Sequence, residues 1–473
     1  MLLKENQHLN MKRIALLLIV FLTGVNSGCP PAGNPVKSSA LQVASNQRFL
    51  TDEKGNPFFW LGDTGWLLFG KLTREETEQY LENRKEKGFN VIQVMVLHAL
   101  DYCNAYGDSA LVSRNVAKPL TTPGNAFEKP DEYDFWDHVD YVVDIAAEKG
   151  IYLGLVPVWG SNVKSGRISR EQAEWYARWL AERFSKHPNI VWLNGGDIRG
   201  SDSTGTWNII GNTLKKYDPG HLITFHPFGR MQSSDWFHNA SWLDFNMFQS
   251  GHRRYDQDDS ERNYGENNWR YAEADYNREP VKPTLDGEPS YEGIPQGLHD
   301  TLQPLWNEND VRRYAYWSVF AGGCGFTYGH NAVMQFYKPG DKGSYGNKKR
   351  WIDAINDPGA GQMQYLKTLM LSRPYFDRIP DQTLLAGPSG EKYDYQAATR
   401  GKDYAFVYTY NGKEIKVHLG KINRKRIKAA WYNPRNGTET GIGIFPNVGI
   451  QRFDPPGEPT EGNDWILILD SVK

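Results

Sequence analysis

The sequence has few cysteines and almost no excess of charge of either sign. Only three of its 473 residues are cysteine, and Cys29, Cys103 and Cys324 lie far apart in the chain. Cysteines so isolated form neither the Cys-x-x-Cys pairs of a zinc site nor a disulfide framework. The formal net charge is −2, from 54 basic and 56 acidic residues. Nothing therefore points to nucleic acid or an anionic membrane surface as a partner.

Several cofactor and metal motifs are also missing. No Gly-x-Gly-x-x-Gly follows the first predicted strand, and no Gly-Lys-Ser/Thr phosphate loop occurs. The sequence contains no His-Glu-x-x-His and no calcium-loop pattern either. We therefore predict a protein that uses no cofactor and no catalytic metal.

The apolar run at the N-terminus is too short to cross a bilayer. Lys12-Arg13 precede the run from Ile14 to Leu22, and small residues follow before Cys29. This order resembles a bacterial lipoprotein signal, in which the cysteine becomes the lipidated first residue, with plain secretion as the alternative. We predict a signal peptide over residues 1–29 and a tether over 30–39. The expected location is the bacterial cell envelope, in the periplasm or on the outer-membrane surface, with Cys29 as the lipid anchor and the protein as a monomer.

Aromatic residues are abundant, at 13% of the chain, with 16 Trp and 26 Tyr. Most single aromatic side chains fill protein cores. An excess of this size also suits flat platforms against which a sugar ring can lie. The composition thus favours a carbohydrate as the ligand without deciding between binding and catalysis.

Residues 40–379 repeat a strand and helix rhythm. Apolar runs bounded by turn residues predict strands, and capping boxes such as Thr73 to Glu76 and Ser169 to Gln172 predict helix starts. The expected strands cover 58–61, 90–97, 151–159, 190–197, 222–227, 243–248, 283–287 and 325–328. The expected helices cover 73–87, 134–149, 169–185, 206–216, 310–320 and 362–371. Eight strands separated mainly by helices predict an α/β fold, a (β/α)8 TIM barrel; a doubly wound open sheet is the alternative.

The pattern of apolar and polar residues changes near residue 380. Alternating side chains, as in Tyr404 to Tyr410, are typical of half-buried strands, and Asn411-Gly412 directly afterwards is a strong hairpin signal. We predict a small all-β sandwich domain over residues 380–473.

Polar residues stand at nearly every C-terminal end of the predicted barrel strands. In such barrels these ends converge on one mouth, where polar groups are disproportionately catalytic. Asp197 follows the fourth strand and Glu288 the seventh, which face one another closely enough for a retaining glycosidase. The candidate substrate-binding residues are Asp63, Trp66, His98, Trp159, Asn194, His226, Asn246, Gln249, Tyr291, Glu292 and His330.

Three motifs carry a resemblance to a known family. They are the run from Phe59 to Trp66, the run Asn194-Gly195-Gly196-Asp197, and the run Asp286-Gly287-Glu288-Pro289. Together they resemble the apiosidase-like barrel glycoside hydrolases, the group around glycoside hydrolase family 140. The tail, with Trp431 to Gly437, is similar to the collagen-binding module that follows those barrels. The resemblance implies that Asp197 is the acid/base and Glu288 the nucleophile.

Physical chemistry supports opposed environments for these two carboxyl groups. Asp197 must hold a proton near neutral pH, while Glu288 must stay ionised. Trp159 and Trp192 can desolvate the acid, and a cation near the fifth strand, His226 or Arg230, can keep the base charged.

The carboxyl groups assigned to catalysis also have alternative structural explanations. Asp197 can cap the helix that follows it. Asp286 competes with Glu288 for its role, but the spacing puts both on the same strand face, so one of them can instead orient its neighbour. The Asn-Gly-Gly-Asp run also departs from the Asn-Glu that usually ends the fourth strand in barrel glycosidases, which weakens the retaining assignment.

We therefore expect a secreted or surface-anchored glycoside hydrolase, exo-acting on the side chains of pectin-type plant polysaccharides. Two alternatives remain open. One is a non-catalytic surface protein that binds glycan or matrix, and the other is an endo-glucanase-type barrel glycosidase.

Overall fold

The computed structural model describes residues 40–472. The predicted signal peptide, the tether and Cys29 lie outside the described residues. The chain opens with a small antiparallel sheet of β1 (Gln42–Val43), β2 (Leu50–Thr51) and β3 (Pro57–Phe58). In the turn between β2 and β3, Asp52 Oδ1 accepts hydrogen bonds from the backbone N–H groups of Lys54 and Asn56.

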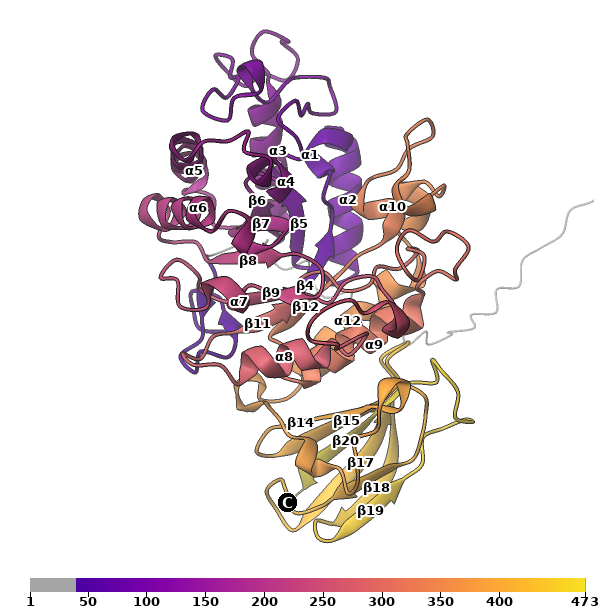
Figure 1. Ribbon diagram of the computed structural model, residues 1–473. Helices are drawn as coiled ribbons and strands as arrows, with labels where there is room; N and C mark the ends of the chain where they lie inside the picture. Colours follow the sequence, from indigo (N-terminus) through magenta and orange to yellow (C-terminus); the bar gives the residue numbers. More distant parts are fainter. Residues whose placement is uncertain (1–39, 473) are drawn as a thin grey trace, which may run out of the picture. The chain divides into compact units, whose positions relative to one another are not determined.

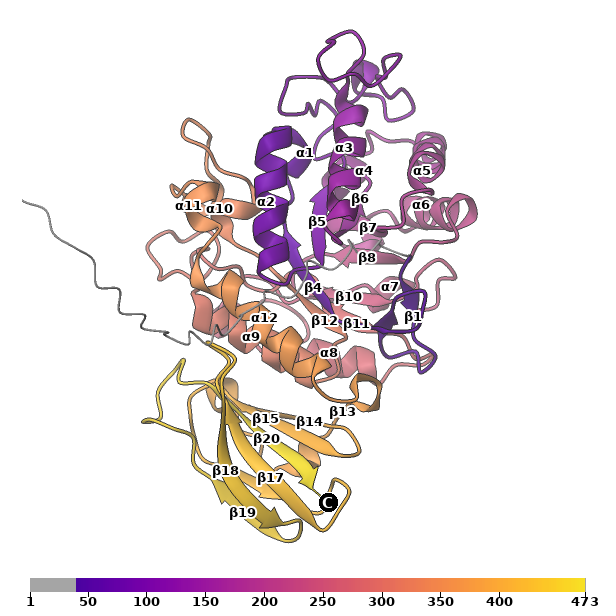
Figure 2. The ribbon, with the colours of Figure 1, turned by 180° about the vertical axis from the view of Figure 1, so that it is seen from behind.

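Eight strands form a parallel barrel, with one short antiparallel strand, β9 (Met231–Gln232), added at β10. Figures 1 and 2 show them from opposite sides, enclosed by helices. The eight are β4 (Trp60–Thr64), β5 (Val91–Met95), β6 (Tyr152–Val156), β7 (Ile190–Ile198), β8 (Ile223–Pro227), β10 (Asn246–Gln249), β11 (Thr284–Asp286) and β12 (Gly325–Tyr328).

The first barrel strand lies beside the last, which excludes the doubly wound open sheet. β12 pairs with β4 in parallel, with Phe326 opposite Leu61. The sheet order runs β8-β7-β6-β5-β4-β12-β11-β10-β9. Between β8 and β10 the barrel is joined by the Asp244 N–H, which donates to the Ile223 carbonyl at 2.9 Å, and by the Thr224 hydroxyl, which donates to the Phe245 carbonyl at 2.7 Å. The predicted (β/α)8 fold is confirmed.

Helices of the barrel cover the outside of the strands and begin where the sequence signals place them. Thr73 and Ser169 are the caps of complete capping boxes, and Asp134 forms a third. None of the described helices is long and apolar enough to cross a membrane. The helices are α1 (Leu68–Lys71), α2 (Arg74–Glu86), α3 (Phe135–Glu148), α4 (Gly160–Lys164), α5 (Arg170–Phe184), α6 (Thr204–Tyr217), α7 (Ser234–Phe237), α8 (Trp269–Tyr276), α9 (Glu308–Phe320), α10 (Asn331–Met334), α11 (Trp351–Ala354) and α12 (Pro358–Leu371).

Strand β7 shows how the barrel separates two apolar layers. Val191 and Leu193 belong to the cluster that fills the barrel, whereas Ile190 and Trp192 belong to the cluster under the outer helices. Alternation along the strand produces this division. Trp192 is fully buried there, and its Nε1 donates to Asp218 at 2.7 Å. The expectation that Trp192 desolvates Asp197 is therefore wrong, because its ring points away from the mouth.

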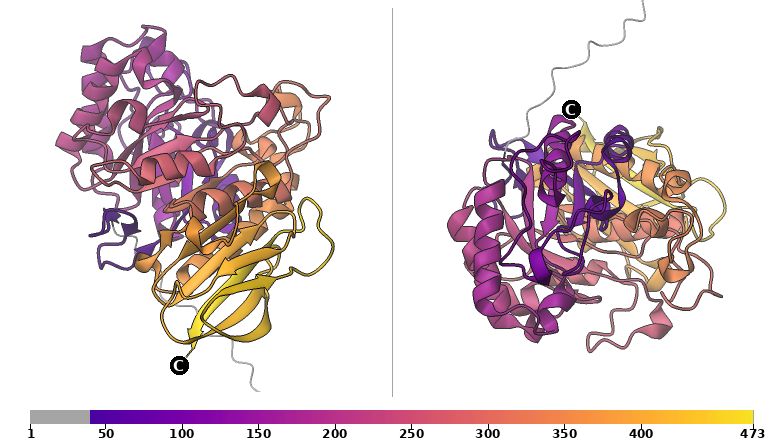
Figure 3. Two further views of the ribbon diagram at one scale, coloured as in Figure 1. Left: turned by 60° about the horizontal axis from the view of Figure 1, so that its bottom comes forward. Right: turned by 90° about the horizontal axis from the view of Figure 1, so that it is seen from above.

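The C-terminal module consists of two antiparallel sheets. The larger has the order β13-β14-β15-β20-β17-β18, and the smaller pairs β16 with β19. The left view of Figure 3 shows these orange and yellow strands. Their bounds are β13 (Ile379–Pro380), β14 (Gln396–Arg400), β15 (Tyr404–Thr409), β16 (Ile415–His418), β17 (Arg426–Tyr432), β18 (Glu439–Pro446), β19 (Ile450–Phe453) and β20 (Trp465–Val472).

The Asn411-Gly412 turn does not make the hairpin that its sequence predicts. β15 pairs with β14 and β20, and β16, which follows the turn, pairs with β19 in the other sheet. Both faces of β15 are buried: Phe406 and Tyr408 join the barrel cluster, while Ala405 and Val407 pack toward the smaller sheet. Because β15 is buried on both faces and pairs with β14 and β20 along its two edges, β16 cannot pair with it.

Candidate active site

A bulge at the end of β7 presents Asp197. The register of β7 against β8 shifts between Gly195 and Ile198. Gly195 and Gly196 have φ of 94° and 100°, and Asp197 itself has φ of 46°. A Cβ on Gly196 would lie 2.6 Å from the Trp159 ring, so a side chain at this position would displace the ring. Asp197 begins no helix, since α6 starts at Thr204 after Ser203. The helix-capping alternative is thereby excluded.

Glu288 follows β11 and is 7% exposed. Asp286, two residues earlier, is fully buried and faces a different set of partners: the Ser250 hydroxyl donates to it at 2.6 Å and the Asn268 amide at 2.9 Å. Burial raises the pKa of Asp286 to about 7. Asp286 thus anchors the loop after β10, and Glu288 is the carboxylate of this pair that faces the mouth.

Two histidines hold the Glu288 carboxylate from opposite sides. His226 Nε2 lies 3.1 Å from Oε2, and His252 Nε2 lies 3.1 Å from Oε1. The Nδ1 atom of each ring accepts a backbone N–H, from Asp197 at 3.2 Å for His226 and from Tyr291 at 3.4 Å for His252. A ring nitrogen that accepts a hydrogen bond carries no proton, so this network assigns the proton to Nε2 in both rings. The His252 N–H therefore hydrogen bonds to Glu288 Oε1, whereas His226 Nε2 lies at contact distance from Oε2 without an aligned hydrogen bond.

The pKa values of the Asp197 and Glu288 carboxyl groups are shifted in opposite directions. Burial, together with the negative charge of Glu288, raises the pKa of Asp197 to about 6. Burial alone would also raise the pKa of Glu288, but hydrogen bonds from His226 and His252 outweigh it and lower this pKa to about 2. Between these values Asp197 holds a proton while Glu288 is ionised. This is the division of roles that acid-assisted displacement needs.

A cavity of about 380 Å³ contains both carboxyl groups. This volume lies near the lower end of the range for small-molecule sites, roughly 300–1,000 Å³. Trp66 and Trp159 form an aromatic wall with ring centroids 5.4 Å apart, and Gln249 hydrogen bonds to Asp197. Five of the predicted substrate-binding residues line the cavity: Trp66, His98, Trp159, Gln249 and Tyr291.

The other six predicted substrate-binding residues do not line the cavity, which corrects those assignments. Asp63 is fully buried and accepts from the Tyr80 hydroxyl and from Arg84 Nε, each at 2.5 Å. Its carboxylate neutralises a buried guanidinium and cannot reach a sugar. The remaining five are likewise buried against protein partners: Asn194 on the Trp207 carbonyl, His226 beside Glu288, Asn246 on His238, Glu292 on Tyr328 and His330 on Asp357.

Sequence reasoning missed several residues of the cavity. His252 and Arg253 lie on the loop after β10, and Arg199 follows directly on the β7 bulge. His226, predicted as a holder of the base, does contact Glu288, whereas Arg230 pairs with Asp258 at 2.9 Å. His252, Arg253 and Arg199 lie in loops, which have no hydrophobic periodicity. Their position shortly after a strand was the only sequence signal that could have predicted them.

Comparison with known proteins identifies the family. The model of the apiosidase-like catalytic domain matches residues 44–377, which includes the whole barrel. The chain belongs to this apiosidase-like family. A second model, described as "Putative collagen-binding domain of a collagenase", matches residues 379–470 of the apiosidase-like protein.

Solved structures extend the likeness to both parts of the apiosidase-like protein. A structure titled glycoside hydrolase is 48% identical, with a TM-score of 0.87, and the match covers 92% of this chain and 98% of that one. A glycoside hydrolase family 5 protein from Bacteroides vulgatus is 45% identical, with a TM-score of 0.87 and coverage of 92% and 94%. No curated protein matched the sequence. The apiosidase-like protein is a glycoside hydrolase of the TIM-barrel type.

Proposed function

We propose that this glycoside hydrolase acts by a retaining mechanism with Asp197 as acid/base and Glu288 as nucleophile. The single observation that carries the proposal is the opposed tuning of the two carboxyl groups in one cavity, with pKa values of about 6 and about 2. A binding protein has no need of one protonated and one ionised carboxyl group side by side. The opposite pKa shifts of Asp197 and Glu288 therefore favour catalysis over the non-catalytic alternative.

The chemistry proceeds in two steps. Glu288 attacks the anomeric carbon while Asp197 gives its proton to the glycosidic oxygen, so that the bond to the leaving group breaks and a glycosyl ester of Glu288 forms. Ionised Asp197 then takes a proton from water, whose oxygen attacks the same carbon and releases Glu288. Each Glu288 oxygen has a second lone pair left after its contact with an imidazole, which keeps the carboxylate able to attack.

The substrate that we propose is a side chain of a pectin-type polysaccharide, attacked at its end. The small volume of the cavity suits a chain end, and Trp66 and Trp159 suit a sugar face. Cations also line the cavity: within residues 40–472 Arg199 has no carboxylate at ion-pair distance, and Arg253 bonds only to Asp259, a carboxylate that is 73% exposed. Available guanidinium groups suit the carboxylates of pectin.

Export and anchoring belong to the same proposal and rest on the sequence of the N-terminal residues. An enzyme for plant polysaccharide must meet a substrate that cannot enter the cell. Labelling cells with a fatty-acid analogue is expected to mark the protein, and Cys29→Ala is expected to abolish the label. A labelled Cys29→Ala protein would exclude Cys29 as the anchor.

The test of the mechanism uses Asp197→Ala, Glu288→Ala and the control Asp144→Ala, an exposed carboxylate on α3 that does not line the cavity. Each of the first two variants is expected to lose at least about 10³-fold in turnover with unchanged folding, and the control to lose none. Azide, which can replace the missing nucleophile, is expected to give a glycosyl azide of inverted configuration with Glu288→Ala only. Normal turnover in either carboxyl variant would exclude the assignment.

A further inference from the structure

A second cavity lies between the loop after β10 and the start of the C-terminal module. Its volume is about 1040 Å³, against about 380 Å³ for the catalytic cavity. One wall comes from residues 254–273, ending in α8, and the other from residues 382–395, ending before β14. Figure 1 shows α8 above β14, the strand that directly follows the second wall. We call this cavity the module cleft. It shares no lining residue with the catalytic cavity.

Aromatic rings from both walls meet in the module cleft. Trp269 of α8 stacks on Tyr395 with a centroid distance of 4.2 Å and an interplanar angle of 5°, and Tyr255 meets Tyr393 at 5.7 Å. The Tyr393 hydroxyl donates to Glu266 at 3.1 Å, and Glu266 in turn accepts from the buried Arg313 at 2.9 Å. These contacts fix the two walls against each other. The cleft is therefore preformed, which lowers the entropic cost of binding a ligand.

The module cleft is lined by charged residues of both signs. Arg254 pairs with Asp256, and Glu266 pairs with Arg313. Four exposed charged residues of the lining remain, and none of them has an ion pair within residues 40–472: Arg270, Glu273, Glu391 and Lys392. Two charges of each sign give no preference for a charged ligand. They do supply strong donors and acceptors for hydroxyl groups, which can serve as both.

The lining also argues against a peptide. It contains aromatic, amide, hydroxyl, charged and glycine residues, and no Leu, Ile, Val or Met. A peptide is held largely through apolar anchors in hydrophobic pockets, which this lining lacks. Flat rings beside polar groups instead match a sugar, which has apolar C–H faces and hydroxyl edges.

One loop separates the module cleft from the catalytic cavity. Gly251, His252 and Arg253 line the catalytic cavity, and the next residues, Arg254 and Tyr255, line the cleft. Consecutive Cα atoms lie about 3.8 Å apart. The two cavities therefore lie on the same loop, close enough for one polysaccharide chain to contact both.

We propose that the module cleft is a second glycan-binding site, which holds an uncharged stretch of the polysaccharide whose end occupies the catalytic cavity. The identity of that polysaccharide rests on the proposed function; the binding site itself rests on the cleft. The C-terminal module, on this account, completes a binding site that the barrel alone does not form.

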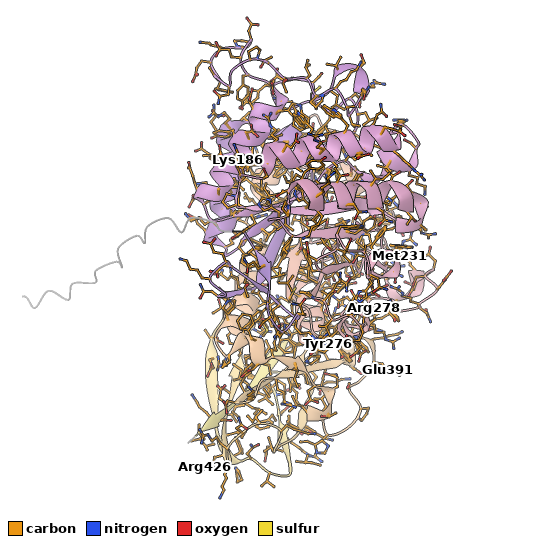
Figure 4. All side chains as sticks on the ribbon, turned by 90° about the vertical axis from the view of Figure 1, so that its left-hand side faces the viewer. Lys186, Met231, Tyr276, Arg278, Glu391 and Arg426 are labelled. Atoms are coloured by element: carbon orange, nitrogen blue, oxygen red, sulfur yellow. The ribbon has the colours of Figure 1, made fainter. Side chains whose placement is uncertain are left out.

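Affinity electrophoresis of the full chain carrying Glu288→Gln, which prevents turnover, tests the proposal with arabinan, galactan, polygalacturonate and soluble collagen. The cleft variant adds Arg270→Ala and Glu391→Ala, both exposed and without ion pairs in the described chain, and circular dichroism checks that it folds like the control. The control adds Arg426→Ala and Glu458→Ala, which remove the same two side-chain types elsewhere. Figure 4 shows Glu391 close to the barrel and Arg426 at the far end of the module.

The cleft variant is expected to bind arabinan or galactan about tenfold more weakly than the control, and Tyr264→Ala to weaken binding as well. Equal binding by cleft variant and control, no binding of any polysaccharide by the parent, or loss of collagen binding alone would each overturn the proposal. The proposed function can fail while the module cleft stands. This is the result if the unmodified enzyme releases no sugar but the cleft variant still loses polysaccharide binding. Sugar release with equal polysaccharide binding overturns the module cleft alone.

Discussion

Two histidines from different parts of the barrel contact the Glu288 carboxylate. His226 belongs to β8, and His252 follows β10. Each ring accepts a backbone N–H at Nδ1 and places its Nε2 3.1 Å from one Glu288 oxygen. Both rings favour the ionised form of Glu288 and offset the effect of its burial, which lowers its pKa to about 2.

The first prediction concerns the pH dependence of the unmodified enzyme. Asp197 must be protonated and Glu288 ionised, so kcat/KM is expected to fall as pH rises above about 6, because Asp197 then loses its proton, and as pH falls toward about 2, because Glu288 then gains one. A pH profile on any accepted substrate checks this. A profile still rising through pH 8 would contradict the role of Asp197 as acid.

Removing one histidine donor changes the acidic side of that profile. In His252→Ala the pKa of Glu288 is expected to rise by about one unit or more, because one hydrogen bond to the ionised form is lost. The acidic limb of kcat/KM then moves to higher pH. His252→Gln keeps an N–H donor and is expected to retain more of the original profile. A lower kcat with an unmoved acidic limb would mean that His252 has only a structural role.

At the scale of elements, the end of β7 depends on two glycines. The run Asn194 to Asp197 marks this chain off from barrels with a simple Asn-Glu ending, and the structure explains it as a bulge. Gly196 allows φ of 100° and lets the Trp159 ring approach the backbone. The bulge thereby positions the acid and one aromatic wall together.

Gly196→Ala is expected to lower kcat at least about tenfold and to destabilise the fold by about 1 kcal/mol or more, because the backbone is left-handed and the Cβ would meet the Trp159 ring. Gly220→Ala is the control, since no atom lies within 4 Å of its Cβ. Steady-state kinetics and urea denaturation measure both effects. Wild-type values for Gly196→Ala would show that the bulge does not position Asp197.

Sequence patterns predicted the elements of this fold well and its loops poorly. The capping box at Thr73 is a local signal, and the helix begins where it predicts. The roles of Asp63 and His252 depend on partners distant in sequence, Arg84 and Glu288, which no local pattern reveals. The Asn411-Gly412 turn shows the same limit, since packing on the barrel decides the partner of β15.

At the scale of the whole molecule, barrel and module share one apolar core and a buried ion pair. Arg312 of α9 meets Asp464 in two hydrogen bonds, each of 2.8 Å, and both side chains are almost fully buried. Tyr316 of α9 stacks on Tyr408 of β15 at 4.9 Å. These contacts make the module a structural part of the enzyme as well as a wall of the module cleft.

Asp464→Ala is expected to destabilise the protein by about 3–5 kcal/mol, because it leaves the Arg312 guanidinium buried without its partner. The double variant Arg312→Met with Asp464→Leu is expected to recover much of this loss. Urea denaturation followed by tryptophan fluorescence and by circular dichroism gives the free energy of unfolding. A loss below about 1 kcal/mol in Asp464→Ala would show that the pair does not join barrel and module.

The central claim is that Asp197 and Glu288 hydrolyse a terminal sugar of a pectin-type chain with retention of configuration. Proton NMR of the anomeric signals, recorded from the first minutes of incubation with a panel of pectin-derived oligosaccharides, tests it most directly. We expect a monosaccharide with the anomeric configuration of the substrate, released by the unmodified enzyme and not by Glu288→Gln. No release from any member of the panel by the folded enzyme, a product of inverted configuration, or equal release by Glu288→Gln would contradict the claim.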